Sequence, residues 1–472
     1  MKKKTNIKIS FVDSYSSQDV TGSNIFIKTP NYKILLDCGM HQSNDKKEDY
    51  LINSRKLKEY KPKDLDFIFI SHLHQDHLGL LPKYYKEGFK GKTIISENSK
   101  DIMKDMLLDS AWICERDTEI LNKQLNKNYT PLYTKDNINT TINNTLEYPI
   151  YEKIKLNDEI SFELIPSGHL LTGTQIVLWI TYNNITKCIG YTGDIGNNLV
   201  DNYYVNQLKY IDKCDLLIGE STYGDRKDLK VRPKQRKYDF NCLEEIIENQ
   251  VIDEKGKLVI PVFAQSRCPS ILSMIYELYK DRDLPCNVYI DSPLAIKLLN
   301  DYDKILNSEY FKKILNWNKL VLIKESEDSK ALVSSNFPCI ILSTSGMCNV
   351  GRIRHHFKSI VPNPNATILF CGYSNPNSLA SIIKEGNNRK INIDGKMYKV
   401  KCDSQSLKSM SGHATYEVLF DYYSKINCSK IVLHHGSEKA KECLANDLRQ
   451  NFEKQCKTTK VICANNSLKI NL

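Results

Sequence analysis

Residues 71–82 carry the densest group of side chains in the chain that could do chemistry. The segment reads SHLHQDHLGLLP and places His72, His74, Asp76 and His77 within six positions. Imidazole nitrogens and carboxylate oxygens are the ligands that zinc and similar ions prefer. A solvated polar loop is the alternative, but the chain has only 10 histidines and three of them lie here. Two histidines two positions apart, His72 and His74, are followed by the adjacent Asp76 and His77. Because this spacing can supply ligands to two neighbouring ions, the segment predicts a two-metal site.

Strands must hold these side chains, and the neighbouring sequence predicts them. The apolar run 66–70 (DFIFI) is typical of a buried strand, and a short helix is expected to open near Asp76. Two further candidates follow predicted strands: His169 comes after 161–166 and Asp194 comes after 187–192. Loops at strand ends commonly carry functional side chains, and a carboxylate has two oxygens. Asp194 is therefore the natural bridge between two ions.

The N-terminal third contains short β-type runs and a polar region. The run 33–37 (KILLD) ends at Asp37, whose carboxylate could cap the turn or accept a hydrogen bond from a metal-ligating histidine. We favour the second interpretation. Residues 99–146 are rich in Asn and Lys and predict surface helices, with a loosely ordered connection at 137–144.

Length and composition indicate a globular protein of two or three domains. The 472 residues include 66 Lys and Arg against 56 Asp and Glu, and this net charge of +10 favours a polyanionic partner. The 15 cysteines include no C-x-x-C pair, which indicates free thiols and a reducing compartment. No apolar run reaches about eighteen residues and no signal peptide is recognisable, so we expect a cytoplasmic protein with no membrane segment.

From about residue 261 the pattern changes to alternating strands and helices. Strands are predicted at 257–261, 287–290, 338–343 and 366–371, and helices at 267–279 and from residue 294. Such alternation is typical of a parallel sheet, so we expect a second, inserted α/β domain. Isolated histidines return after it: His413 lies in SMSGHATYE, and His434 and His435 lie in KIVLHHGSE.

The motifs together resemble a known family. VTGSNIFI, LLDCG, SHLHQDHLG and the loops of His169 and Asp194 look like the metallo-β-lactamase fold, while GESTYG, IDSPLA, TSGMCNVGR, SGHAT and HHG resemble its β-CASP branch. That branch includes ribonuclease J and the cleavage subunit of the eukaryotic mRNA 3′-end processing machinery. The resemblance implies an α/β protein: an αββα sandwich formed by residues 1–222 and 409–472, with a parallel-sheet β-CASP domain inserted at 223–408.

The resemblance also implies roles for particular residues. It assigns two zinc ions per chain, the first held by His72, His74 and His169, the second by Asp76, His77 and His435, with Asp194 shared. Asp76 would orient the attacking water. Glu220 would support His413 as the general acid toward the leaving oxygen.

The implied activity is zinc-dependent hydrolysis of single-stranded RNA to 5′-phosphate and 3′-hydroxyl ends, as an endonuclease or also as a 5′-exonuclease. The inserted domain is expected to close over the metal site, with Arg267, Arg352 and the loop containing Ser345 as phosphate-binding candidates. A surface or structural role for either arginine is about as common. DNA hydrolysis, hydrolysis of a small molecule and a weakly catalytic RNA-binding scaffold are the alternatives, and homodimerisation is left open.

Four departures from the family pattern bear on substrate contacts and on His413. Thr415 and Ser437 stand where acidic residues are usual, Ser266 stands where glycine is usual, and NPNS at Asn375 replaces a loop with Gly and Thr. All seven predicted metal ligands are retained.

Overall fold

The computed structural model describes residues 6–12, 20–43, 45–198, 203–372, 378–386, 389–465 and 468–472. Asn375 lies outside these ranges. The chain forms two units: unit 1 comprises Met1–Asn198, Val205–Leu229 and Gly412–Leu472, and unit 2 comprises Leu199–Tyr204 and Lys230–Ser411. The predicted domain boundaries after residues 222 and 408 stay a proposal.

Two seven-stranded sheets form the centre of unit 1. The first has the order β22-β1-β2-β3-β4-β5-β6, and the second has the order β21-β20-β11-β10-β9-β8-β7. The first sheet comprises β1 (Lys8–Phe11), β2 (Ile25–Lys28), β3 (Lys33–Leu36), β4 (Phe67–Phe69), β5 (Lys92–Ser96), β6 (Thr145–Tyr148) and β22 (Lys469–Asn471). The second comprises β7 (Ile154–Lys155), β8 (Ile160–Pro166), β9 (Thr174–Tyr182), β10 (Ile185–Tyr191), β11 (Lys213–Glu220), β20 (Asn427–His434) and β21 (Lys460–Cys463).

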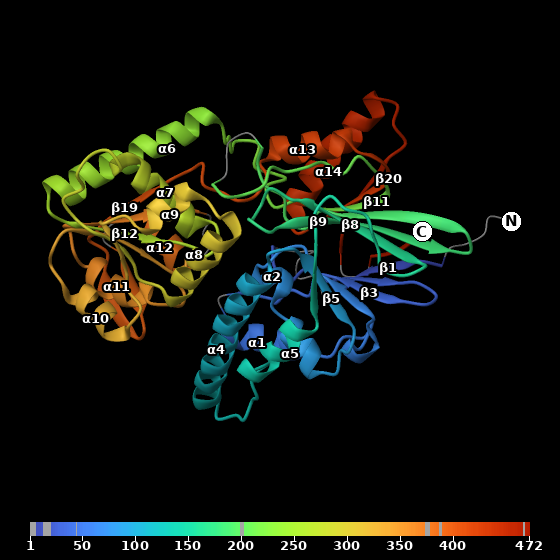
Figure 1. Cartoon of the computed structure of the whole chain (residues 1–472), viewed down its shortest axis with the longest axis horizontal. Helices are drawn as coiled ribbons and strands as arrows, with labels where there is room; N and C mark the ends of the chain where they lie inside the picture. The colour runs from blue at the N-terminus through green and yellow to red at the C-terminus, as the bar shows by residue number, and fades with distance from the viewer. Residues whose placement is uncertain are drawn as a thin grey trace. The chain divides into compact units, whose positions relative to one another are not determined.

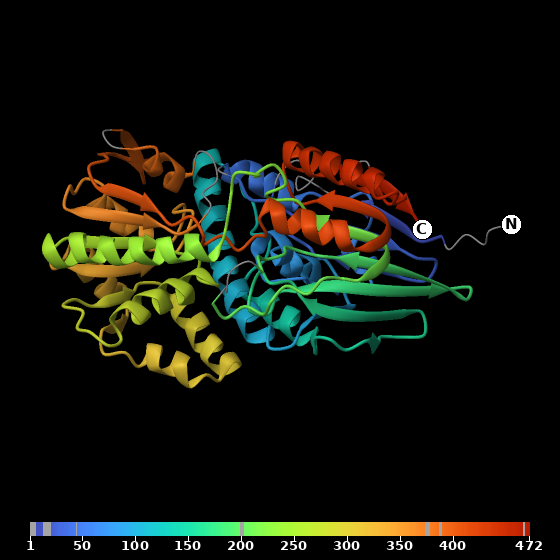
Figure 2. The same cartoon turned by 90° about the horizontal axis from the view of Figure 1, so that it is seen from above.

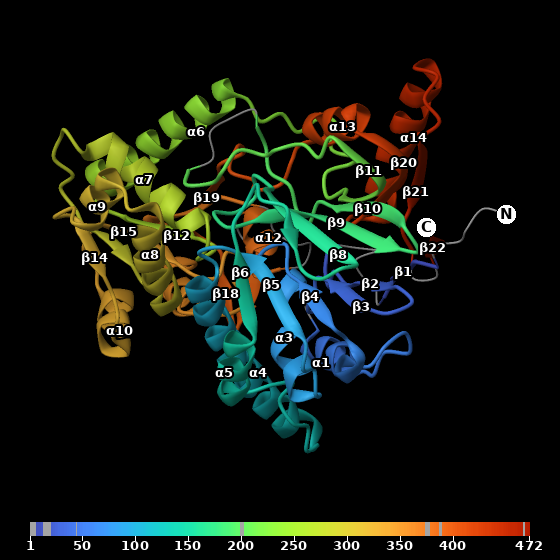
Figure 3. The ribbon, with the colours of Figure 1, turned by 45° about the vertical axis from the view of Figure 1, so that its right-hand side comes forward.

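The core of unit 1 lies between these sheets. Phe69 of the first sheet packs edge-on against Phe162 of the second, with ring centroids 5.2 Å apart. On the first-sheet side lie α1 (Lys46–Ser54), α3 (Leu81–Lys86), α4 (Lys100–Leu125) and α5 (Lys135–Asn143); on the other side lie α13 (Tyr416–Lys425) and α14 (Glu438–Lys454) (Figure 1; α3 is labelled in Figure 3). The view in Figure 3 shows the same order of layers. The predicted αββα sandwich is confirmed.

Helix α5 corrects one prediction, because residues 137–144 are not a loosely ordered connection. Thr134 and Asn137 form a capping box at the start of α5, and Ile138 and Thr141 are buried on its inner face. Asparagine has a low helix propensity, but the cap and the buried face outweigh that preference here.

Unit 2 is built on a six-stranded sheet in which every neighbouring pair is parallel. Its order is β14-β13-β15-β12-β16-β19, formed by β12 (Lys257–Pro261), β13 (Val288–Ile290), β14 (Leu320–Leu322), β15 (Cys339–Ser343), β16 (Ala366–Phe370) and β19 (Asp403–Ser406). The helices are α6 (Pro233–Ile246), continued by a π-helical segment (Ile247–Asp253), α7 (Arg267–Tyr279), α8 (Pro293–Leu306), α9 (Glu309–Leu315), α10 (Ser326–Ser334), α11 (Ile353–Ile360) and α12 (Leu379–Lys384). They are coloured from green to orange in Figure 2. A hairpin of β17 (Lys390–Ile393) and β18 (Lys396–Lys399) completes the unit. The predicted α/β insertion is confirmed.

A buried carboxylate anchors the end of β13 in unit 2. Asp291 accepts hydrogen bonds from Arg352 Nη1 at 2.8 Å, from His356 Nε2 at 2.6 Å and from Ser329 Oγ at 2.7 Å. Burial raises the pKa of Asp291, but these donors outweigh that effect and hold its pKa below the ordinary value. Because the pKa is lower in the folded state, the charged group stabilises unit 2 above about pH 4 and loses that contribution as the pH falls further.

Replacing Asp291 with asparagine should lower the free energy of unfolding by about 3 kcal/mol, because it leaves the Arg352 charge without its carboxylate. Urea denaturation measures the change. Asp394→Asn is the matched control, since Asp394 pairs with Arg354 and Lys358 at a far more exposed site. We expect that control to cost less than about 1 kcal/mol. Equal losses for the two variants would contradict the account of the buried cluster.

Candidate metal centre

The fold of unit 1 brings the seven predicted ligands together. His72 and His74 lie in the loop after β4, and Asp76 and His77 lie in the short helix α2 (Gln75–Leu78) that follows. His169 comes after β8, Asp194 after β10 and His435 directly after β20. In the first group, the donor atoms of His72, His74, His169 and Asp194 all lie within 4.8 Å of one another, as do those of Asp76, His77 and His435 in the second.

The two groups meet at Asp194. Its Oδ2 lies 3.6 Å from His72 Nε2 and 3.8 Å from His169 Nε2, on the side of the first group. Its Oδ1 lies 3.2 Å from His77 Nε2 and 3.3 Å from His435 Nδ1, on the side of the second. One carboxylate oxygen thus faces each group.

Asp194 also provides the test of whether a metal fits. Its side chain is 1% exposed, yet within the described ranges neither carboxylate oxygen has a hydrogen-bond partner. A buried, unsatisfied carboxylate is costly unless a cation balances it. Imidazoles with carboxylates are a zinc-type donor set, so the residues present fit a metal ion in each group.

Asp37 fixes the orientation of one candidate ligand. His77 Nδ1 donates to Asp37 Oδ2 at 2.6 Å, which turns His77 Nε2 toward the cluster. The same Oδ2 accepts from Tyr191 at 2.6 Å, and Oδ1 accepts from the backbone N–H of Ser71 at 2.7 Å. The predicted contact of Asp37 with a candidate ligand histidine is confirmed, and the backbone N–H from which Asp37 accepts a hydrogen bond belongs to Ser71 of the metal-site loop and not to the turn after Asp37.

The other histidine rings are oriented in the same way. His169 Nδ1 donates to the carbonyl of Gly412 at 3.0 Å, and His72 Nδ1 lies 3.1 Å from Ser71 Oγ. Both rings therefore present Nε2 to the cluster. His74 instead presents Nδ1, which lies 3.2 Å from His72 Nε2 and 3.3 Å from His169 Nε2.

Burial favours the neutral form of the three histidines in the first ligand group. It lowers the pKa of His74 to about 4 and lowers the pKa of His72 and His169 well below the ordinary value. These rings are neutral near pH 7, as a metal ligand must be. Burial raises the pKa of Asp194, but the adjacent His435, His77 and His72 outweigh that effect and lower it, so Asp194 is a carboxylate.

Glu220 and His413 form a pair beside the cluster. Glu220 is the last residue of β11, and its Oε2 lies 3.3 Å from His413 Nδ1, while its Oε1 accepts from the backbone N–H of Ile195 at 2.6 Å. The predicted contact is therefore present. Burial lowers the pKa of His413, but Glu220 outweighs that effect and raises it to about 9. The His413 ring is 23% exposed, whereas the Glu220 side chain is buried.

The three predicted phosphate-binding residues all lie in unit 2. Arg352 directs Nη1 to Asp291 and Ile323 O and Nη2 to Lys324 O, contacts that favour a structural role. Arg267 begins α7 and donates to Ser266 Oγ at 3.2 Å. Ser345 closes its own loop through two bonds to the carbonyl of Val350. Phosphate binding by these residues stays a prediction.

Two of the departures from the family pattern lie at the starts of helices. Ser437 caps α14, because its Oγ accepts from the backbone N–H of Ala440 at 3.1 Å. Thr415 occupies the N-cap position of α13 with a buried side chain, and its hydroxyl has no hydrogen-bond partner in the described structure.

Sequence reasoning missed the supporting contacts of Tyr191, the Gly412 carbonyl and Thr222, whose Oγ1 lies 3.3 Å from His435 Nδ1. Tyr191 gave a usable signal, since it is a polar-tipped residue at the end of an apolar strand just before Asp194. The other two gave none.

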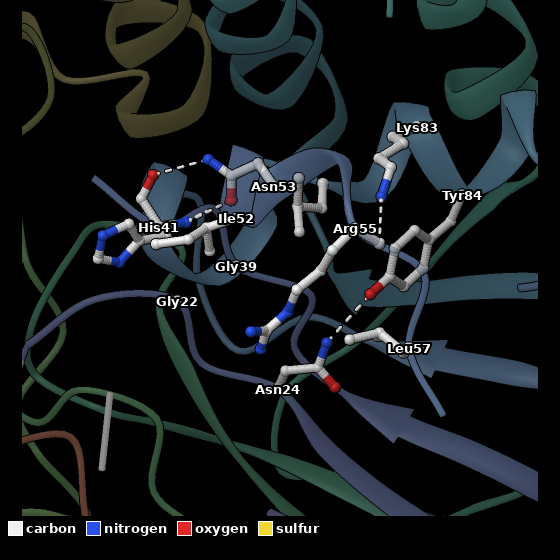
Figure 4. A pocket seen from close by; sticks show the side chains of 11 residues that line it. Gly22, Asn24, Gly39, His41, Ile52, Asn53, Arg55, Leu57, Lys83 and Tyr84 are labelled. Carbon is white, nitrogen blue, oxygen red and sulfur yellow. Dashed lines mark hydrogen bonds between the residues drawn. The ribbon is translucent and has the colours of Figure 1, made fainter. Parts of the chain in front are cut away.

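A small cavity of unit 1 lies near the predicted ligands but has none of them in its lining. Gly39, His41, Arg55 and Lys83 are among its lining residues (Figure 4). Asn53 holds the His41 backbone from both sides, at 2.8 Å each. These bonds hold the segment just after Asp37 in place. We therefore assign the residues around the cavity a structural role beside the metal centre.

Comparison with known proteins agrees with this geometry. Residues 18–121 match the metallo-beta-lactamase superfamily, residues 269–383 the Beta-Casp domain, and residues 397–459 the Zn-dependent metallo-hydrolase RNA specificity domain. The chain belongs to the metallo-β-lactamase superfamily and, within it, to the β-CASP family of ribonucleases.

Several relatives match nearly end to end. A protein named RNase J-like protein from Methanocaldococcus jannaschii is 31% identical over 89% of this chain and 90% of its own length. "Probable RNase MJ4" of the same organism is 30% identical over 91% of this chain and 93% of its own length. A ribonuclease of Thermus thermophilus is 26% identical over 90% of this chain and 92% of its own length. The crystal structure of a protein of unknown function from Enterococcus faecalis V583 has a TM-score of 0.56 at 12% identity, covering 99% of this chain and 100% of that one, which supports the fold alone. None of the described helices has the length and apolar character needed to cross a bilayer.

Proposed function

We propose that this protein is a zinc-dependent ribonuclease that hydrolyses phosphodiester bonds of single-stranded RNA and leaves 5′-phosphate and 3′-hydroxyl ends. The observation that carries the proposal is Asp194, a buried carboxylate that presents one oxygen to each of two ligand groups. Membership of the β-CASP family and relatives named as ribonucleases support RNA as the substrate.

Seven residues would hold two zinc ions: His72, His74 and His169 the first, Asp76, His77 and His435 the second, with Asp194 between them. When bound, such ions lower the pKa of water to about 7 and polarise phosphoryl oxygens. The chain keeps the ligand imidazoles in place through Asp37 and the Gly412 carbonyl.

Two side chains would move or hold protons. Burial raises the pKa of Asp76, but His77 and His435 outweigh that effect and lower it, so Asp76 is a carboxylate that can accept a hydrogen bond from the attacking water and orient it. His413 holds its Nδ1 toward Glu220, which leaves Nε2 as the nitrogen that would protonate the departing 3′-oxygen.

The activity is tested by incubating purified protein with end-labelled single-stranded RNA and DNA of equal sequence, with and without chelator. We expect RNA cleavage that the chelator abolishes and added zinc restores. Faster cleavage of DNA would reassign the substrate. Binding of RNA with no cleavage at saturating zinc would favour the scaffold alternative, and absence of both would favour a small-molecule hydrolase.

Removing the metal should destabilise unit 1, because its ligands come from four separate segments of the chain. Chelation is expected to lower the melting temperature by roughly 5 °C or more, the effect of a ligand present far above its Kd. Calorimetry measures the shift, and metal analysis should give about two zinc equivalents per chain. Asp194→Asn is the control, since chelator should shift it much less. A parent protein that melts at the same temperature with and without chelator would contradict the prediction.

A further inference from the structure

Unit 2 carries a hairpin whose charge is almost entirely positive. Residues 389–401 contain β17, a turn at Asp394 and Gly395, and β18, which is labelled in Figure 3. The two turn residues have φ 52° and 83°, as a type I′ hairpin turn requires. Five residues of this segment are Lys or Arg and one is acidic, so it supplies +4 of the chain's net charge of +10. None of them belongs to the ligand groups of the metal centre.

The register of the hairpin brings lysines together on its outward face. The two isoleucines of β17 are buried in the core of unit 2, so Lys390 and Asn392 point outward. Lys390 lies directly opposite Lys399, and Asn392 lies directly opposite Met397. Lys401 is two residues beyond Lys399, about 7 Å along the strand, and faces the same side because the valine between them is buried. All five side chains are exposed.

This arrangement is unfavourable in the free protein. Like charges directly opposite each other on neighbouring strands repel, and Lys390 and Lys399 are such a pair. Within the described ranges, neither of them forms an ion pair, and Lys396 and Lys401 form none either. Lys396 instead lies over the ring of Tyr398, at 5.6 Å from its centroid. The outward face therefore carries positive charge that no described carboxylate balances.

The acids of the hairpin and its flanks offset little of this charge. Asp394 pairs with an arginine and a lysine of α11, at 2.6 and 2.7 Å. Glu385 pairs with Arg389 at the start of the segment. Asp403, at the start of β19, is a single exposed carboxylate close in sequence to the lysines. The local field thus favours an anion that comes from outside the chain.

Protection against aggregation is the ordinary explanation for lysines on an exposed hairpin. Charged side chains keep a short strand from pairing with another chain. That purpose needs charge, but it gains nothing from two like charges placed opposite each other. A Lys–Glu pair at the same two positions would protect equally well and would also stabilise the hairpin. The pair Lys390–Lys399 therefore indicates a binding role.

A chain of phosphates has the properties that this face fits. Lysine binds phosphate as a mobile point charge, and neutralising a nucleic acid releases its counterions. Lys399 and Lys401 recur along one extended strand with Lys390 beside them, which suits a linear polyanion better than a compact one. Met397 is 54% exposed and offers a flexible apolar contact on the same face.

We propose that the outward face of residues 389–401 is an accessory RNA-binding surface of unit 2, which holds the phosphate backbone of single-stranded RNA without regard to sequence. The inference rests on the proposed ribonuclease function for the identity of this polyanion. Because the hairpin contributes nothing to the ligand groups, it sets the affinity for RNA and not the rate of hydrolysis.

The test measures binding of a labelled 20-nucleotide single-stranded RNA to the full, zinc-loaded chain by fluorescence anisotropy at several salt concentrations. The RNA carries 2′-O-methyl groups, which keep every phosphate charge, and a gel establishes that it stays intact. Each phosphate contact contributes about 0.7 to the slope of log K against log salt. Replacing Lys390, Lys399 and Lys401 together with glutamine should reduce that slope by about 2 and weaken binding at about 0.1 M salt roughly 10-fold or more.

The matched control replaces Lys255, Lys313 and Lys330 with glutamine. These exposed lysines lie elsewhere in unit 2 and remove the same total charge, so affinity and slope should stay close to the parent values. Circular dichroism melting establishes that each variant is folded. Because the hairpin variant loses a like-charge pair, we expect it to melt at or above the temperature of the parent.

Cleavage kinetics separate this surface from the metal centre. The hairpin variant should raise KM for RNA and leave kcat at the parent value, since all seven candidate ligands and His413 are untouched. RNA binding that depends on the hairpin, in a protein that cleaves no RNA, would count against the proposed function alone. Cleavage with unchanged KM and unchanged binding in the hairpin variant would count against the surface alone.

Two results would overturn the proposal. One is that the hairpin variant and the control have the same affinity and the same salt slope, which would leave the lysines as protection against aggregation. The other is that a polyglutamate peptide of equal charge binds the parent more tightly than the RNA does and loses this advantage in the hairpin variant. The surface would then fit an acidic protein segment and not RNA.

Discussion

Replacing Asp194 with asparagine is expected to lower the rate of RNA cleavage by roughly 10³-fold or more. The substitution keeps the shape of the side chain but removes a carboxylate that faces both ligand groups. Metal-ion stabilisation of charge in the transition state contributes several kcal/mol, and each 1.36 kcal/mol is about tenfold in rate. Single-turnover cleavage at saturating protein measures the loss, and metal analysis should show fewer than two bound ions.

Asp158→Asn is the control for that experiment. Asp158 pairs with Lys155 at a site where its side chain is 97% exposed, so the loss of its charge should leave cleavage and metal content unchanged. An Asp194→Asn variant that retains two ions and the parent rate would contradict the role of Asp194.

Replacing His413 with alanine should slow single-turnover cleavage by about 10² to 10⁴, the usual contribution of a positioned proton donor. Both ligand groups are complete without His413, so metal content and RNA affinity should stay at the parent values. These two readouts separate loss of the acid from collapse of the site.

The leaving group provides a sharper test of His413. A substrate with a 3′-thio linkage at the scissile bond should recover most of the lost rate, because the departing sulfur needs no proton. His355→Ala is the matched control, since this exposed histidine of unit 2 lies in neither ligand group. If His413→Ala loses an ion, or cleaves ordinary RNA at the parent rate, then His413 is not the acid.

Much of the fold was predictable because local sequence signals agree with it. The strands at 257–261 and the helix at 267–279 occur with the predicted bounds, since strong apolar patterns and short turns define them. The helix Lys135–Asn143 was missed because its stability comes from a cap and from the burial of Ile138 and Thr141. A propensity scale contains neither contribution.

The residues of the site were likewise only partly predictable from local sequence. His72, His74, Asp76 and His77 are recognisable from their spacing, whereas His435 is 358 residues from His77 and only the family resemblance predicted that it joins them. The contact of Arg352 with Asp291, 61 residues away, leaves no signal in the sequence. Polar partners distant in the chain are therefore what sequence reasoning lacks.

We propose that RNA cleavage by this chain requires two zinc ions, which the residues around Asp194 would hold. Titrating metal-free protein with zinc and measuring the initial rate of cleavage of a single-stranded RNA at each step tests it most directly. The rate should stay low through the first equivalent and reach a plateau at about two equivalents per chain. Full activity at one equivalent, or cleavage that persists in the metal-free protein, would contradict the account.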